Sequence, residues 1–270
     1  MANNTNPVFR KIESEVQSAY VEGSEVRNAT FNGFLLKTGI LFVAALVAGA
    51  VFFQLFSLQA MYTTIDGYLE LNSANAMPFI VLAVIAPILA FVSAIVGTLS
   101  VKASPVCAIL YSLFEGIFFG MVIGFLELVM PGIGVAAIVS LAAIFGVTLL
   151  MYSFKVIRVT KKFYRVVSTM LIAAIVMIGL NFILSLFFSP MQALMSTGIG
   201  GMWMVILIEV FFVVLGSLML CLDFDRATQL AENGFPKKYE WQASLGLMVT
   251  LVWILIHLLR ILVIIFGRRR

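Results

Sequence analysis

Residues 202–222 read MWMVILIEVFFVVLGSLMLCL and lead directly into Asp223-Phe224-Asp225-Arg226. An apolar run of about 20 residues is long enough to cross the hydrocarbon core of a bilayer as an α-helix. A carboxylate at the end of such a run is costly unless it is paired, protonated or in contact with water. The stretch therefore predicts a membrane-spanning helix that carries at one end an acid, Asp223, able to respond to cations or protons.

Composition places the whole chain in the same class. Of its 270 residues, 62% are hydrophobic and 11% are charged, and the mean hydropathy is +1.11. In soluble domains about a quarter of the residues are charged. The net charge of +4 is explained by basic loops, so we expect lipid and no nucleic acid as partner. Cys107 and Cys221 are expected to be reduced thiols.

Seven apolar segments are found along the chain, and their lengths favour helices over the alternating strands of a membrane barrel. They are approximately 34–56, 78–101, 108–130, 135–154, 166–188, 202–222 and 244–266. The sequence therefore predicts an all-α integral membrane protein with a membrane domain over 34–266. A polar tail, 1–33, precedes it without an apolar signal region, and a basic tail, 267–270, follows.

The loops indicate how the chain crosses the membrane. Residues 57–77, 131–134 and 189–201 contain no Lys or Arg, whereas the alternate loops are basic. The basic residues are Lys102, then Lys155, Arg158, Lys161, Lys162 and Arg165, then Arg226, Lys237 and Lys238. Because positive loops stay in the cytoplasm, we expect a cytoplasmic N-terminus. Arg268–Arg270 then lie outside after seven crossings, which departs from the same rule.

The third span carries a stripe of small residues at four-residue spacing, Ser112, Gly116, Gly120 and Gly124. Small residues let helix backbones approach closely, so this stripe predicts a packing face. Glu115 lies beside it and is expected to face the bundle interior, since lipid would not accept a carboxylate. It is either a ligand or a structural group that shares a proton.

Spans six and seven hold the remaining polar groups. Glu209 and Asp223 are fourteen residues apart and lie close to one helical face, which fits a cation route or two unrelated interfacial acids. Asp223 and Asp225 are alternatively the polar start of a loop.

On span seven, Thr250, Trp253, His257 and Arg260 share one face. His257 is either a hydrogen-bonded core imidazole or a pH sensor, and Arg260 is expected to extend toward the outer interface. Lys37 and Glu127 are interpreted as interfacial.

Motifs for catalysis are missing. One histidine supports neither a zinc site nor an intramembrane metalloprotease motif, and there is no nucleophile elbow or phosphate-binding loop. We therefore expect no enzymatic activity, no cofactor and no tightly bound metal, with Asp223 and Glu115 as weak calcium candidates.

Several strings in order resemble one membrane-protein family, the Bax inhibitor / YccA-like family (transmembrane Bax inhibitor motif), in its longer bacterial branch. They are NPVFRK at 6–11, YSLFEG at 111–116, VIRVT at 156–160, LDFD at 222–225, Trp241, and LLR at 258–260. The resemblance covers nearly the whole chain. It implies a seven-helix bundle with the seventh helix near the centre, in a bacterial plasma membrane.

The resemblance also implies a function, that of a pH-sensitive calcium leak channel gated by two aspartates that share a proton. Carried over to this chain, the first aspartate is Asp223, and a basic residue that assists the gate falls near Lys102. The second position is occupied by Thr250, which cannot ionise, so Asp225 and Glu115 become the other acids to consider. Glu209, His257 and Arg260 are candidates for an ion path or its support.

Two other functions compete with the channel. A non-conducting regulator would bind another membrane protein, such as a quality-control protease, through the polar tail and the small-residue helix faces. A proton-coupled transporter would show an internal repeat or broken helices in matching halves, and the sequence shows neither.

Overall fold

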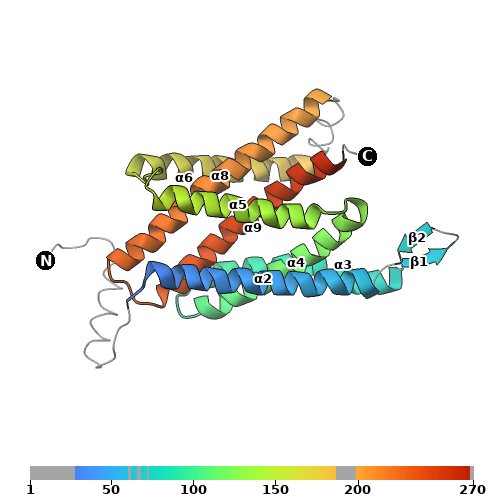
Figure 1. Ribbon diagram of the computed structural model, residues 1–270, viewed down its shortest axis with the longest axis horizontal. Helices are drawn as coiled ribbons and strands as arrows, with labels where there is room; N and C mark the ends of the chain where they lie inside the picture. Colours follow the sequence, from blue (N-terminus) through green and yellow to red (C-terminus); the bar gives the residue numbers. More distant parts are fainter. Residues whose placement is uncertain (1–27, 60–61, 66–67, 72, 187–198, 268–270) are drawn as a thin grey trace.

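The computed structural model describes residues 28–59, 62–65, 68–71, 73–186 and 199–267. In this part of the chain seven helices are long and apolar enough to span a membrane. They are α2 (Phe31–Gln59), α3 (Ser73–Leu99), α4 (Ser104–Val129), α5 (Ile133–Ser153), α6 (Lys161–Ser185), α8 (Ile199–Glu232) and α9 (Tyr239–Gly267). The predicted seven-helix membrane protein is confirmed (Figure 1).

One element was not predicted. Two short strands, β1 (Tyr62–Ile65) and β2 (Tyr68–Leu71), form an antiparallel hairpin between α2 and α3, with Tyr62 opposite Leu71. The hairpin projects beyond the helices at one end of the bundle (Figure 1). The hairpin therefore lies outside the helical bundle and does not pack between its helices.

The outer surface of the bundle is apolar. Large side chains such as Leu99, Phe182 and Ile172 are 80%, 67% and 63% exposed. In water such a surface would drive aggregation, whereas the hydrocarbon of a bilayer is as apolar as these side chains. The helices therefore contact lipid, and the chain is a multi-pass membrane protein.

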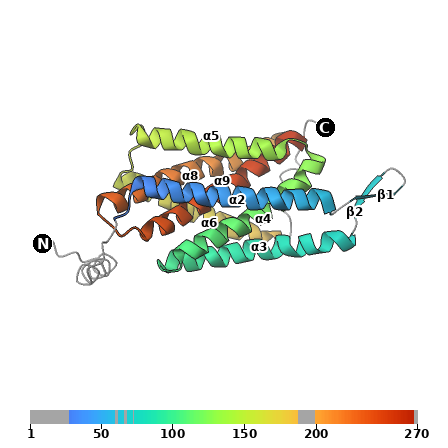
Figure 2. The ribbon, with the colours of Figure 1, turned by 60° about the horizontal axis from the view of Figure 1, so that its bottom comes forward.

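The last helix, α9, lies at the centre of the bundle. It packs against α2, α3, α4, α5 and α8. Its core-facing residues Leu245, Leu247 and Ile254 are fully buried. Figure 2 shows α9 running between α5 on one side and α4 on the other. The predicted central position of the seventh helix is confirmed. A shift of α9 would therefore change its packing against several neighbouring helices.

Helices α2 and α4 pack with their backbones in contact. A Cβ atom on Gly116 would overlap the backbone of Ala45, and one on Gly120 would overlap the backbone of Gly49. Only glycine permits this approach, because any side chain would force the two helices apart. The small-residue stripe on the third span is thus the packing face that its spacing predicted.

The helix bounds differ from the apolar segments, most of all at the end of α8. The sixth apolar segment stops at 222, but the helix continues to Glu232, so Asp223 and Asp225 do not begin a loop. Side-chain hydrogen bonds stabilise the last two turns of α8: Gln229 donates to Asp225, and Asn233 donates to the carbonyl of Gln229. Hydropathy marks where a helix leaves the apolar core and not where its backbone hydrogen bonds end.

Most of the basic loop residues lie at one end of the bundle, and the hairpin lies at the other. The basic end comprises the start of α2 and the connections 100–103, 154–160 and 233–238. The hairpin end comprises β1, β2, the turn at 130–132 and the end of α9. Figure 1 shows the start of α2 and the end of α9 at opposite ends of the bundle, which fits an odd number of crossings.

Candidate functional site

A hydrogen bond joins the acid of α8 to the hydroxyl of α9. Thr250 Oγ1 donates to Asp223 Oδ2 at 2.6 Å, a distance typical of a strong bond to a carboxylate. Thr250 is 3% exposed, and Asp223 is partly buried beside it. The residue at the predicted second acid position therefore does contact Asp223, as a hydroxyl and not as a carboxylate.

No cation is paired with Asp223 among the described residues. Arg226 follows one turn later on α8 and is exposed. Lys102 lies in the turn between α3 and α4, also exposed, and neither an ion pair nor a hydrogen bond joins it to Asp223 in the described part of the chain. The hydroxyl of Thr250 is thus the main contact of the carboxylate, and Arg226 acts on it through its charge without an ion pair. The protonation state of Asp223 therefore changes the strength of its main contact.

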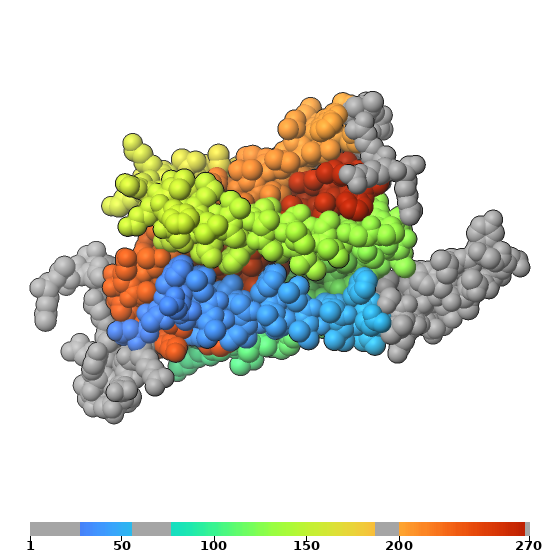
Figure 3. Space-filling model, in the orientation of Figure 1, coloured from blue at the N-terminus to red at the C-terminus, as the bar shows by residue number. Residues whose placement is uncertain are grey.

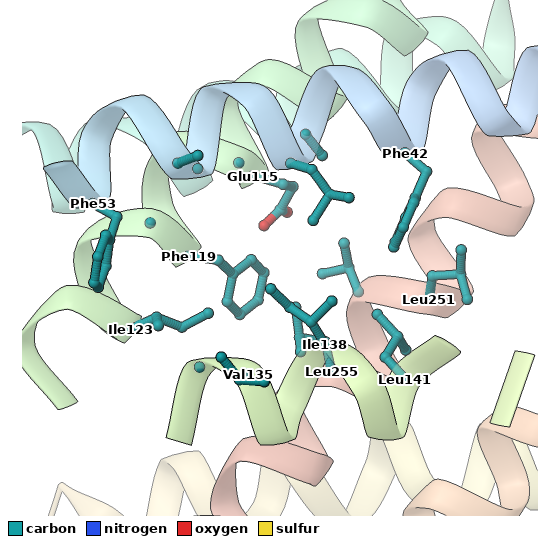
Figure 4. Close-up of a pocket in the computed structure, with 18 of the residues that line it drawn as sticks. Phe42, Phe53, Glu115, Phe119, Ile123, Val135, Ile138, Leu141, Leu251 and Leu255 are labelled. Atoms are coloured by element: carbon teal, nitrogen blue, oxygen red, sulfur yellow. The ribbon is translucent and has the colours of Figure 1, made fainter. Parts of the chain in front are cut away.

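The other two acids considered as partners of Asp223 lie elsewhere. Asp225 is two positions further on α8, which turns it to the opposite side of the helix, where it accepts a hydrogen bond from Gln229 at 2.6 Å. Tyr152 of α5 donates to Thr228 at 2.9 Å on the same part of α8. Glu115 belongs to α4 and points into a separate cavity (Figure 4).

A second polar cluster lies toward the hairpin end of the α8–α9 interface. Glu209 is 1% exposed, and its Oε2 lies 2.6 Å from His257 Nδ1. Its other oxygen accepts a hydrogen bond from Arg260 Nη1 at 3.3 Å. The ring of Phe212 stacks on His257 with the centroids 4.5 Å apart. His257 is therefore a buried, hydrogen-bonded imidazole, and Arg260 combines an exposed side chain with a contact to Glu209.

Apolar residues separate the two polar clusters. Ile254 is fully buried between Thr250 and His257, and a Cβ on Gly216 would meet its side chain. Trp253 donates through its indole nitrogen to the carbonyl of Phe212 at 3.4 Å. Glu209 and Asp223 therefore face the same helix pair, but a closely packed layer lies between them.

Glu115 lies in a cavity of about 390 Å³ bounded by α2, α4, α5 and α9. Figure 4 shows its carboxylate directed into a space whose walls are otherwise aliphatic and aromatic side chains. Tyr111, one turn earlier on α4, is the side chain that forms a hydrogen bond with the Glu115 carboxylate. A second cavity of about 580 Å³ is lined by Asn181 of α6, Glu209 and Arg260.

Sequence reasoning missed an ion pair at the basic end. Lys37 Nζ lies 2.6 Å from Glu240 Oε2, and the two side chains are 10% and 1% exposed. Glu240 also accepts a hydrogen bond from the backbone N–H of Thr30 at 2.8 Å. Lys37 is therefore a buried group that joins the start of α2 to the start of α9, and its interpretation as interfacial did not include this partner. Its position within the first apolar segment could have indicated that this lysine needs a buried acidic partner.

Glu127 at the hairpin end also has a structural partner. Its two oxygens accept hydrogen bonds from the backbone N–H groups of Gly132 and Gly134, at 2.5 Å and 3.1 Å. These N–H groups belong to the start of α5, which has no capping side chain at Gly132. A carboxylate at a helix N-terminus satisfies unpaired donors and complements the helix dipole.

The described residues do not assemble a metal site. No group of three or more His, Cys, Asp or Glu side chains in this part of the chain is placed to hold an ion. Calcium takes six to eight oxygen ligands. Among the described residues, Asp223 has no second carboxylate beside it, and Glu127, which lines the same cavity as Glu115, already accepts hydrogen bonds from Gly132 and Gly134. A tightly held calcium ion is thus unsupported at either position.

Comparison with known proteins identifies the family to which these features belong. The family model described as "Bax inhibitor 1 like" matches residues 6–267, nearly the whole chain. No curated protein and no solved structure matches.

Proposed function

This chain belongs to the Bax inhibitor 1 like family as a multi-pass membrane protein, and on that premise we propose that it is a pH-sensitive calcium leak channel gated at Asp223. The observation that carries the proposal is the 2.6 Å hydrogen bond between Thr250 and Asp223. It joins the helix at the bundle centre to the helix that carries the acid, so a change at this contact reaches the whole core.

The physics of the contact gives the gate its sensitivity to protons. A hydrogen bond to an ionised carboxylate is about twice as strong as one between neutral groups. Thr250 supplies that donor while Asp223 is ionised, and protonation of Asp223 reduces the contact to a neutral one. Acidification therefore weakens the link between α8 and α9.

The close packing near this contact supports the direction of gating that we propose. Ile254 and Gly216 fill the α8–α9 interface between the two polar clusters, which leaves no continuous polar path along it. A contact found together with a blocked interface stabilises the closed state. Calcium entry should therefore increase as the pH falls and Asp223 takes up a proton.

The orientation belongs to the same proposal. The positive-inside rule favours a cytoplasmic location for the N-terminus and the Asp223 end of the bundle, in a membrane that we propose to be the bacterial plasma membrane. Asp223 then senses cytoplasmic pH. Glu209, which is paired with His257 and Arg260, supports the path toward the opposite side.

The test is calcium entry into liposomes as a function of pH. Asp223→Asn keeps the shape of the side chain but cannot ionise, so we expect its flux to vary less than twofold with pH and to match the native flux at the lowest pH. Asp225→Asn removes the neighbouring acid, whose partner is Gln229, and should keep the native pH profile. A pH profile of Asp223→Asn identical to that of the native protein would refute the proposal.

The competing function, a regulator that binds another membrane protein, assigns the central role to the N-terminal tail. Residues 1–27 lie outside the described part of the chain, and no contact of the described residues favours that function. Deleting residues 1–27 distinguishes the two, because a channel keeps its calcium flux without the tail.

A further inference from the structure

We propose that the cavity around Glu115 binds a lipophilic organic cation that enters from the bilayer. This site is separate from the Asp223–Thr250 contact and does not depend on calcium conduction. The cavity holds about 390 Å³, which is within the range of pockets that accept small organic molecules.

The shape of the cavity determines the route of entry. Its rim includes side chains that are exposed on the lipid-facing surface, with Leu46 of α2 at 37% and Val135 and Ile138 of α5 at 69% and 38%. Its depth is formed by Met248 and Leu251 of α9, at 2% and 4% exposure. Figure 3 shows α2 and α5 side by side on this face, with deeper helices visible between them.

The chemistry of the walls determines the class of ligand. Phe42, Phe53 and Phe119 contribute aromatic rings, and most of the other lining residues are aliphatic or glycine. Aromatic faces and a carboxylate both attract a cation, while the aliphatic walls favour an apolar body. A single positive charge on a hydrophobic frame matches both features.

The charges of the cavity exclude the simpler occupants. Glu127 also lines it, but its two oxygens are occupied by the N–H groups of Gly132 and Gly134. Glu115 has no ion-pair partner among the described residues, and Tyr111 beside it adds no positive charge. Calcium needs more oxygen ligands than this cavity offers, and a neutral lipid tail would leave an ionised Glu115 without a counter-charge.

The experiment measures binding of radiolabelled tetraphenylphosphonium to the full chain in phosphatidylcholine nanodiscs by equilibrium dialysis. We expect saturable binding at one site per chain. Glu115→Gln should weaken the affinity at least tenfold, and Asp225→Asn, the same change of charge outside the cavity, should leave it within twofold. Ala50→Phe, which fills the cavity from α2 and keeps Glu115, should also weaken it at least tenfold.

A neutral competitor separates charge from hydrophobicity in the native protein, without depending on any variant. Triphenylphosphine oxide has a similar apolar frame and no net charge, so we expect displacement only at concentrations at least tenfold higher than for unlabelled tetraphenylphosphonium. The proposal is overturned if the native chain shows no saturable binding, if Glu115→Gln and Asp225→Asn bind equally well, or if the neutral competitor is as effective as the cation.

Discussion

Replacing Lys37 by methionine should destabilise the protein by about 3–5 kcal/mol, the usual cost of leaving one member of a buried ion pair without its partner. Met retains much of the side-chain volume but removes the charge that lies 2.6 Å from Glu240. Because Glu240 is 1% exposed, water cannot replace the lost ammonium group. The remaining donors, the N–H of Thr30 at 2.8 Å and its hydroxyl at 3.4 Å, are neutral and do not compensate a full charge.

The free energy of unfolding is measured by titrating the micelle-solubilised protein with sodium dodecyl sulfate and following tryptophan fluorescence. Trp241 is a local reporter, since its ring lies 5.1 Å from Lys37 Nζ. Adding Glu240→Gln to Lys37→Met should recover about 2 kcal/mol, because glutamine removes the buried charge and still accepts from Thr30. The reasoning is wrong if Lys37→Met costs less than about 1 kcal/mol, or if the second substitution destabilises the first variant further.

Two further predictions concern the hairpin end and the orientation. His257→Leu should destabilise the protein by about 1–3 kcal/mol in the same titration, because it removes the partner that lies 2.6 Å from buried Glu209. Arg260→Gln should cost less, since the arginine side chain is 57% exposed. Equal costs for the two variants would contradict this prediction. The orientation can be tested in a chain whose two cysteines are replaced by serine. A cysteine that replaces exposed Lys237 should react with impermeant maleimide only from the cytoplasmic side, and one that replaces exposed Pro131 only from the opposite side. The reverse pattern would invert the proposed topology.

Much of the fold could be predicted from the sequence because each helix must satisfy its own backbone hydrogen bonds in lipid and be apolar for about 20 residues. The same rule explains what was missed. It says nothing of a hairpin between two spans, such as β1–β2, or of a helix that continues past its apolar segment, as α8 does from Asp223 to Glu232.

The candidate site could be predicted only in part. Helical spacing placed Thr250, His257 and Arg260 on one face of α9, and the structure shows that this face contacts α8 through Asp223 and Glu209. The pair formed by Lys37 and Glu240 was not foreseen, because its members are about 200 positions apart and no helical period relates them. The same limit hid the cavity at Glu115, which requires four helices to form its walls.

The contact between Thr250 and Asp223 can be tested without altering the acid. Thr250→Ser retains the hydroxyl donor, and Thr250→Val retains the shape of threonine without it. If this hydrogen bond holds the channel closed, calcium entry into liposomes at neutral pH should be several-fold higher for Thr250→Val than for the native chain and nearly unchanged for Thr250→Ser. Equal calcium entry for the valine and serine variants would contradict the gating role of the contact.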